Sequence, residues 1–439
     1  MLRTYIQDGK DAAPHLTLPR YGSIQSRAAS ITTGQIEKES NNALLGTRHK
    51  WRVPRTLTFN ERNYIMRVVS QYVTKSLIIA RDNYGYCLLV SIISLCYTAL
   101  RYTYNYEFNG ATYEQIFTFI APVPFGKRVL TPILANIIVH SGISQYRAFQ
   151  LIEITSIASL IFALYNIFQL YVEKRSAKVL SLLFICFLPL VFLLRTPFPL
   201  LFPWDTPAMT LIAWSIYCLL KAKWKAALGV MLLASLNRES AVLIPLLYTG
   251  MYGDRTPIKR FAGYLAMLIA VYISCQYAVG TTLHNNLPFY NLHGGMSLQR
   301  AGTWRMLYSM GWLNSSNINW LVLVSSMAGT PLLFLMFIRT LPCYFRRYGL
   351  ISLAYFVMLS IVGNLFESRI FGEIVLILYI PIALAVCSYI SNTCVFTRYR
   401  LSGEENILSK YAIYMEWVAL LVLLIAPVIV YHLLIRMPV

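Results

Sequence analysis

The stretch AALGVMLLASLNRESAVLIPLLYTGM, residues 226–251, decides how this chain folds. It places Asn237, Arg238, Glu239 and Ser240 between two apolar runs that are each too short to cross a bilayer. Charged groups inside the hydrocarbon layer are costly unless they are paired or face a polar cavity. The stretch is therefore either one span with a buried ion pair or a hairpin of two half-length helices.

The composition around this stretch is that of a membrane protein. Of the 439 residues, 57% are hydrophobic and 13% are charged, whereas soluble domains average about 45–50% apolar and about 25% charged residues. Further apolar segments lie at 84–100, 149–172, 179–194, 207–220, 261–279, 319–338, 350–364, 374–391 and 413–435. We therefore expect an all-α polytopic transmembrane helical bundle of about 9–11 membrane segments, with re-entrant or surface helices.

Basic residues give the expected orientation. If the N-terminus is cytoplasmic and 226–252 is a hairpin, the inner loops are 173–178, 221–225, 253–260, 339–347 and 392–410, each with three Lys or Arg. Twenty-eight of the 38 basic residues then lie inside, as the positive-inside rule requires. A single crossing at 226–252 would invert every later loop, so the hairpin is preferred. The net charge of +20 follows from these loops and does not indicate a nucleic-acid partner.

The chain divides into five expected parts. Residues 1–58 are basic and predicted to be disordered in the cytoplasm, and 59–83 should form an amphipathic helix on the cytoplasmic membrane surface, or a helix packed on a soluble partner. The transmembrane core spans 84–391 and carries two outer loops, 101–148 and 280–318. A cytoplasmic loop at 392–412 and a C-terminal transmembrane helix at 413–439 complete the chain.

The first outer loop holds two carboxylates, Glu107 and Glu114, ahead of the basic pair Lys127-Arg128. A carboxylate at the membrane boundary suits a general base, and an arginine offers a forked donor for a phosphate. The alternative is that both carboxylates are solvated and the basic pair contacts lipid headgroups.

Three further positions place charge at the same predicted membrane face. Asp205 opens the fourth span, where it either caps the helix or belongs to a site. Arg238 and Glu239 form either a structural ion pair or a phosphate-binding arginine steadied by its neighbour. Glu153 lies about one turn inside the second span and could face the same site.

Glu367 and Arg369 repeat this chemistry between two later spans. Residues two apart do not share a helix face, so each is expected to pair with another segment. The histidines His140, His284 and His293 lack metal-ligand spacing, so no metal site is predicted. A divalent metal held by the carboxylates of the first outer loop or the fourth span is compatible with their chemistry, but their spacing does not imply one.

Four motifs in this order resemble a known family. They are PFGKRVLTP at 124–132, WDTP at 204–207, LNRES at 236–240 and NLFESR at 364–369. The pattern is similar to multi-pass bacterial membrane proteins of the glycosyltransferase-C (GT-C) type and covers about residues 84–391.

The resemblance implies a transferase in the bacterial inner membrane. It would move a sugar from a polyprenyl-phosphate donor to a glycan, lipid or protein acceptor on the extracytoplasmic face. Glu114, or alternatively Glu107, would act as catalytic base beside Asp205. Lys127, Arg128 and Arg238 would hold the donor phosphate, supported by Glu239, Glu367, Arg369 and Glu153, and Trp304 and Trp312 would stack on sugar.

Two other readings stay open. Many GT-C members carry Asp in the first outer loop, where this chain has Asn109-Gly110. The protein could therefore be a non-catalytic GT-C-like scaffold whose basic N-terminus docks protein partners. The third reading is a transporter or flippase for an anionic lipid or glycan, against which stands the lack of an inverted repeat.

Overall fold

The computed structural model describes residues 83–122, 125–193, 200–253, 256–283, 311–362, 367–391 and 395–397. All of them belong to the second of two compact units, Ile79–Val439. The expectations for 1–58, for the interfacial helix 59–83 except its last residue, for Trp304 and for the span 413–439 lie outside the described residues. So do most of the loops 280–318 and 392–412.

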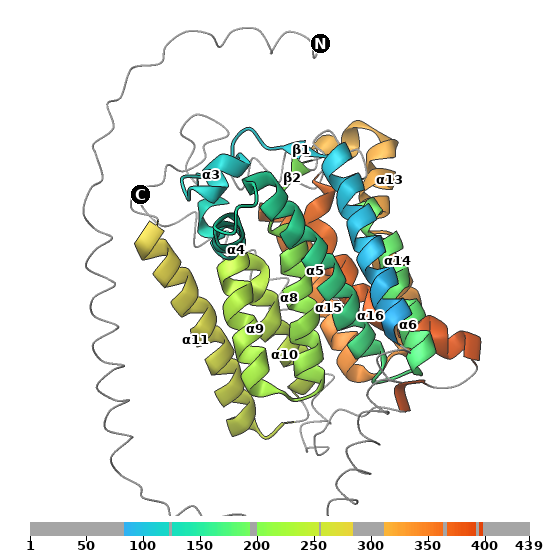
Figure 1. Ribbon diagram of the computed structural model, residues 1–439. Helices are drawn as coiled ribbons and strands as arrows, with labels where there is room; N and C mark the ends of the chain where they lie inside the picture. The colour runs from blue at the N-terminus through green and yellow to red at the C-terminus, as the bar shows by residue number, and fades with distance from the viewer. Residues whose placement is uncertain are drawn as a thin grey trace, which may run out of the picture. The chain divides into compact units, whose positions relative to one another are not determined.

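The described part of the unit is helical (Figure 1), with one parallel pair of two-residue strands. After an opening helix at Asn83–Tyr104, the elements are β1 Tyr106–Glu107, α3 Tyr113–Phe117, η1 Phe125–Lys127, α4 Leu130–Val139, α5 Gln145–Phe168, α6 Lys174–Leu183, η2 Phe184–Cys186, α7 Leu188–Phe192, β2 Leu200–Leu201, α8 Asp205–Leu220, α9 Trp224–Asn237, η3 Glu239–Val242, α10 Leu243–Tyr252, α11 Ile258–Leu283, α13 Asn317–Ser326, α14 Thr330–Phe337, η5 Ile338–Thr340, α15 Cys343–Val362, η6 Ser368–Phe371, α16 Gly372–Ser391 and η7 Val395–Thr397. Helices α3 and α4 are short and lie within the stretch 101–148, between the first two long helices.

Five described helices are long and apolar enough to cross a membrane: Asn83–Tyr104, Gln145–Phe168, Lys174–Phe192, Ile258–Leu283 and Arg369–Ser391. A sixth is added if the pair Asn317–Ser326 and Thr330–Thr340, bent by 69°, counts as one span. These helices agree with a multi-pass membrane protein but are fewer than the 9–11 segments expected. The difference arises partly because α8, α9 and α10 have 16, 14 and 10 residues, less than a straight span requires.

The stretch 226–251 is a hairpin of two short helices. At the α9 end, the Asn237 side-chain amide donates to the carbonyl of Trp204, just before α8 begins. At the other end, the Tyr252 hydroxyl donates to the carbonyl of Leu219, where α8 closes. Helices α9 and α10 therefore run antiparallel beside α8, and the hairpin alternative is confirmed for the geometry of the chain.

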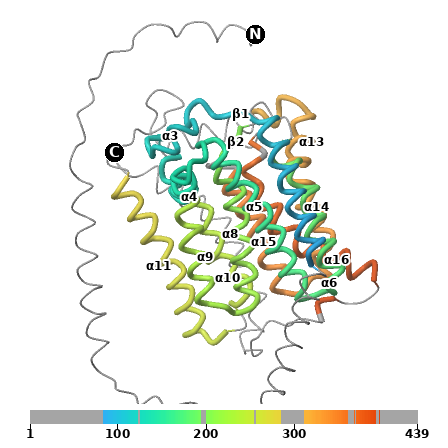
Figure 2. Tube along the Cα trace, in the orientation of Figure 1, coloured from blue at the N-terminus to red at the C-terminus, as the bar shows by residue number. Residues whose placement is uncertain are grey.

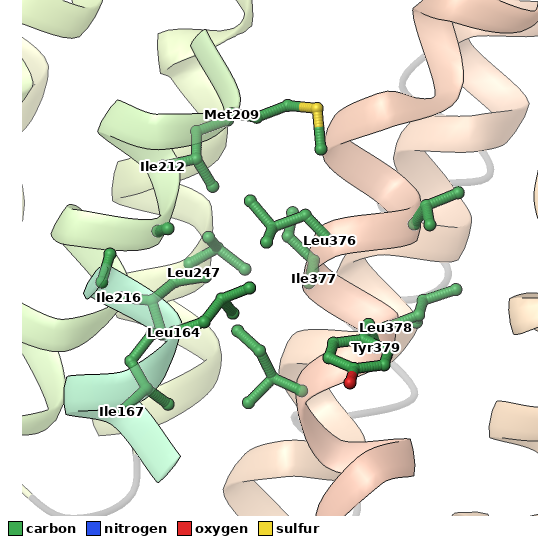
Figure 3. Packing of buried hydrophobic residues seen from close by; sticks show 14 of the residues in the cluster. Leu164, Ile167, Met209, Ile212, Ile216, Leu247, Leu376, Ile377, Leu378 and Tyr379 are labelled. Carbon is green, nitrogen blue, oxygen red and sulfur yellow. The ribbon is translucent and has the colours of Figure 1, made fainter. Parts of the chain in front are cut away.

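Helix α16 forms the centre of the bundle, since 89% of the apolar 18-residue stretch within Arg369–Ser391 is buried. Figure 3 shows Leu376 and Ile377 of this helix facing Met209 and Ile212 of α8. By contrast, only 17% of the corresponding apolar stretch of α11 is buried. Helix α11 lies along one side of the other helices (Figure 2). An apolar face of this kind suits contact with lipid, because lipid tails are as apolar as the side chains that meet them.

Close helix contacts replace part of the hydrophobic driving force in a lipid environment. Gly250 of α10 lies directly against α15: a Cβ atom there would be 2.9 Å from the Ile351 Cδ1 atom and 3.2 Å from the Tyr348 backbone nitrogen. The backbone of Tyr348 cannot rotate away as a side chain can. Gly250 therefore sets the distance between these two helices.

We predict that Gly250→Val lowers the stability of the protein, because its methyl groups would force α10 and α15 apart. Overpacking of this kind costs about 1–3 kcal/mol. The matched control is Gly229→Val on α9, where an added Cβ meets nothing within 4 Å. The measurement is the thermal midpoint of the detergent-solubilised protein, and equal midpoints for the two variants would refute the prediction.

The hairpin also makes a topological prediction. Lys225 at the start of α9 and Lys259 at the start of α11 are both exposed, and a hairpin returns the chain to the side from which it came. Single cysteines at these positions, in a background lacking the native cysteines, should react with an impermeant maleimide from the same side of the membrane. Reaction from opposite sides would restore the single-crossing alternative.

Candidate functional site

The tip of the hairpin joins several segments of the bundle. Asn237 donates from its amide nitrogen to the carbonyl of Trp204 at 3.0 Å and accepts from the Thr131 hydroxyl at 2.8 Å. Asn237 is completely buried, so both bonds are needed to satisfy its amide group. The tip is thereby fastened to α4 and to the segment that leads into α8.

Arg238 is the next residue and contacts two carboxylates. Its Nη1 lies 3.2 Å from the Asp205 Oδ1 atom and 3.1 Å from the Glu373 Oε1 atom. The hydroxyl of Ser240 donates to the same oxygen of Glu373 at 2.9 Å. The hairpin tip therefore binds the first turns of both α8 and α16 through charge-assisted hydrogen bonds, which are stronger than neutral ones.

Asp205 lies at the centre of the charged residues. Three arginines from three segments surround it: Arg238 at 3.2 Å, Arg369 at 3.5 Å and Arg101 at 3.7 Å. Asp205 is 1% exposed, and it is the first residue of α8 rather than its N-cap, which is Trp204. The capping interpretation of Asp205 is therefore wrong: its carboxylate forms ion pairs with the arginines and does not cap the helix.

The most deeply buried pair is Arg101 with Glu153. The guanidinium Nη1 donates to the Glu153 carboxylate and to the hydroxyl of Thr206 at 2.7 Å, and that hydroxyl donates to the same carboxylate at 2.7 Å. The Arg101 guanidinium also stacks 4.3 Å from the ring centroid of Phe192. The side chains of Arg101 and Glu153 are 0% and 2% exposed, so this pair has the environment of a structural ion pair.

Two other arginines rest on an aromatic cluster formed by Phe125, Phe202 and Trp204, whose ring centroids are 5.2–6.1 Å apart. The Arg369 guanidinium carbon lies 3.9 Å from the ring centroid of Phe202, and that of Arg128 lies 4.8 Å from the ring of Trp204. Stacking on an aromatic face leaves the edge of a guanidinium free to donate hydrogen bonds.

Each of these stacked arginines has its own carboxylate partner. The Arg369 Nη2 lies 2.6 Å from Glu367, and the Arg128 Nε lies 3.2 Å from Glu239. The expectation that Glu367 and Arg369 each pair with another segment is confirmed for Arg369, whose Nη1 lies 3.5 Å from Asp205. Glu367 and Arg369 also pair with each other, because Glu367 precedes a 3₁₀ turn with non-helical backbone angles. Glu239 likewise partners Arg128 and not the adjacent Arg238.

We call these residues the arginine–carboxylate network: Arg101, Arg128, Arg238, Arg369, Glu153, Asp205, Glu239, Glu367 and Glu373. Side-chain exposure rises across it from 0% at Arg101 to 16% at Glu367 and 37% at Glu239. The network thus has a closed end at Arg101 and Glu153 and an open end at Arg128 and Glu239. Arg128 Nη1 at the open end and Arg369 Nε have no hydrogen-bond partner among the described residues, and the same holds for Arg101 Nε at the closed end.

The electrostatics of the open end follow from the Arg128–Glu239 pair. Burial lowers the pKa of the Arg128 guanidinium, while Glu239 opposes the shift. Burial alone would raise the pKa of the Glu239 carboxyl group, but Arg128, the residue's own backbone N–H and Arg238 hold it below its ordinary value. Glu239 is therefore ionised at neutral pH and serves as the counter-ion of Arg128.

The residues expected to act as catalytic base lie outside the ion pairs. Glu107 accepts a hydrogen bond from the backbone N–H of Tyr113 at 2.6 Å and pairs in the β1–β2 ladder with Leu201, next to the aromatic cluster. Glu114 is exposed on α3, and Lys127 is half-buried in η1. Among the described residues, neither Glu114 nor Lys127 forms an ion pair within 4.0 Å.

Most of the remaining expected site residues meet in the network. Arg128, Asp205, Arg238, Glu239, Glu367, Arg369 and Glu153 come together, as anticipated for one site. Trp312 is half-buried against the helical core, and Trp304 lies outside the described residues. In the described part of the chain, no group of three or more His, Cys, Asp or Glu side chains is placed to hold a metal ion.

Sequence reasoning missed Arg101, Thr206 and the aromatic cluster as parts of the site. Arg101 follows the apolar run 84–100 and was assigned to the outer loop, but the helix continues to Tyr104 and turns its side chain inward. The available signal is helical spacing, since Arg101 lies one turn after Tyr97, which is also buried.

We predict that Glu153→Gln destabilises the protein, since it removes the closest counter-ion of the fully buried Arg101. Breaking a buried pair in this way costs about 3–5 kcal/mol. The double variant Arg101→Met/Glu153→Leu should be more stable than Glu153→Gln alone, because no unpaired charge remains. Thermal midpoints in detergent measure both effects, with Glu173→Gln, an exposed carboxylate at the start of α6, as control.

No protein-family model, curated protein or solved structure matches this chain. The function is therefore inferred from the network itself.

Proposed function

We propose that this protein is a membrane glycosyltransferase that takes its sugar from a polyprenyl-phosphate donor. The observation that carries the proposal is convergence: the four motifs that resemble GT-C proteins meet at one place. They supply Arg128, Asp205, Arg238, Glu239, Glu367 and Arg369, which are separated by up to 241 positions and lie in one network.

The arginines have the chemistry needed to hold a phosphate. Arg128 and Arg369 stand on the same aromatic cluster, and each keeps a buried N–H without a partner among the described residues. A guanidinium edge matches two phosphate oxygens at once. When the bond from the sugar to the donor phosphate breaks, the phosphate gains negative charge, which preorganised arginines stabilise.

The base in this proposal is Glu107. It lies beside the strand that leads into the aromatic cluster, whereas the exposed Glu114, preferred from the sequence, lies farther along on α3. The acceptor hydroxyl attacks the anomeric carbon and gives its proton to Glu107, and the polyprenyl phosphate leaves toward the arginines. Asp205 is unsuited to this task, because it is buried among three cations and acts by positioning them.

A second candidate, a non-catalytic scaffold, is favoured by the closed end of the network. Arg101 with Glu153, and Arg238 with Glu373, are ion pairs between buried side chains of the protein itself. Charges paired in this way can fix the arrangement of helices without any ligand.

The test is sugar transfer by the purified full chain in lipid nanodiscs, offered a panel of labelled polyprenyl-phosphate sugars and acceptors. We expect Glu107→Gln to reduce turnover by about 100-fold or more, as for loss of a general base. Arg369→Lys, which keeps the charge but loses the fork, should reduce kcat/KM by about 10-fold. Arg147→Gln, an exposed arginine at the start of α5, is the matched control and should behave as wild type.

Correct folding of each variant is checked by its thermal midpoint. Absence of transfer from every donor by folded wild-type protein would reject the transferase and favour the scaffold. Full activity of Glu107→Gln would reject only the assignment of the base.

A further inference from the structure

Arg128 is held differently from the other arginines of the network. It is 9% exposed, and its one ion-pair partner among the described residues is Glu239, at 3.2 Å from Nε. Its Nη1 is buried and has no hydrogen-bond partner in the described part of the chain. Arg128 is thus a buried cation with an unused donor and a single counter-ion.

Glu239 is also exceptional among the carboxylates. Asp205 and Glu373 are each 1% exposed and are held by more than one group, whereas the Glu239 side chain is 37% exposed and has Arg128 as its one ion-pair partner among the described residues. A partly exposed ion pair contributes little net free energy, because water can solvate the carboxylate when the pair opens. Glu239 is therefore the carboxylate of the network that leaves its arginine most easily.

The backbone around Glu239 is held by contacts that do not involve its side chain. The carbonyl of Glu239 accepts a hydrogen bond from the Tyr272 hydroxyl of α11 at 3.2 Å. On either side, Arg238 and Ser240 are both held by Glu373. Rotation of the Glu239 side chain away from Arg128 therefore requires no movement of the hairpin tip.

Arg128 cannot stay buried without an anion, since an unpaired charge in a low-dielectric environment is strongly disfavoured. Any group that releases Glu239 must bring its own negative charge. A phosphate meets this need, because two of its oxygens can accept from the Nε–Nη2 edge of the guanidinium at once.

We propose that Glu239 is an exchangeable counter-ion: it occupies Arg128 in the empty protein, and the phosphate group of a lipid-like phosphate ester displaces it. The inference rests on the proposed function for the nature of the ligand. It goes further in naming the group that competes with the donor. Binding of the phosphate thus breaks the Arg128–Glu239 ion pair and leaves a carboxylate without its arginine at the open end of the network.

The test measures equilibrium binding of radiolabelled octyl phosphate, below its micelle concentration, to the full chain in nanodiscs of uncharged lipid. Empty nanodiscs correct for partitioning. Glu239→Gln should bind about two- to fivefold more tightly than wild type, the range expected from loss of a partly exposed competing ion pair. Arg128→Gln should bind about tenfold more weakly. The control Glu173→Gln changes an exposed carboxylate at the start of α6 and should leave binding unchanged.

The double variant Arg128→Gln/Glu239→Gln gives the sharpest comparison. If Glu239 acts through Arg128, the double variant should bind as weakly as Arg128→Gln, and the gain from Glu239→Gln should disappear. Binding by Glu239→Gln that equals or falls below wild type overturns the proposal, including the case in which neither protein binds. An equal gain for inorganic phosphate would assign the site to free phosphate and overturn the lipid-like ligand.

The transferase proposal fails separately. Octyl phosphate binding that follows the expected pattern, without sugar transfer from any donor, would reject the transferase and keep the counter-ion. Sugar transfer by wild type together with unchanged binding in Glu239→Gln would keep the transferase and reject the exchangeable counter-ion.

Discussion

A buried charge requires a partner, and this requirement organises the described part of the molecule around Asp205. Its carboxylate is 1% exposed and meets Arg101, Arg238 and Arg369 from three separate segments. Each arginine is stable at its depth only because carboxylates lie beside it. The helices are therefore held in one arrangement by their polar ends as well as by packing, and this matters in a lipid environment that rewards apolar contacts weakly.

The location of this site could be read from the sequence, because lone charges between apolar runs have few acceptable places. Asp205, Arg238 and Glu367 were expected at one end of the bundle for that reason, and they meet there. Their pairing could not be derived, since it depends on how each helix is rotated and on where it begins. Arg101 shows the limit: an arginine at the end of an apolar run is usually solvated, and only the extra turn of helix to Tyr104 buries it.

The network combines two kinds of ion pair that serve different purposes. At the closed end, the fully buried Arg101 donates to Glu153 and to Thr206, which suits a permanent structural contact. At the open end, Glu239 is partly exposed and the buried Arg128 leaves one donor unused. Structural and functional readings of buried charge are often set against each other. In this fold they apply to opposite ends of one network, so evidence for one role does not exclude the other.

The hairpin tip has a consequence for how the protein can change. Asn237, Arg238, Glu239 and Ser240 follow one another directly, and they reach α4, α8, α16 and Arg128 between η1 and α4. Turns between helices ordinarily tolerate added or lost residues. Here one inserted residue would move the side chains that follow it by one position, so that they would no longer meet their partners. The tip can vary by substitution, one contact at a time, but its length is fixed.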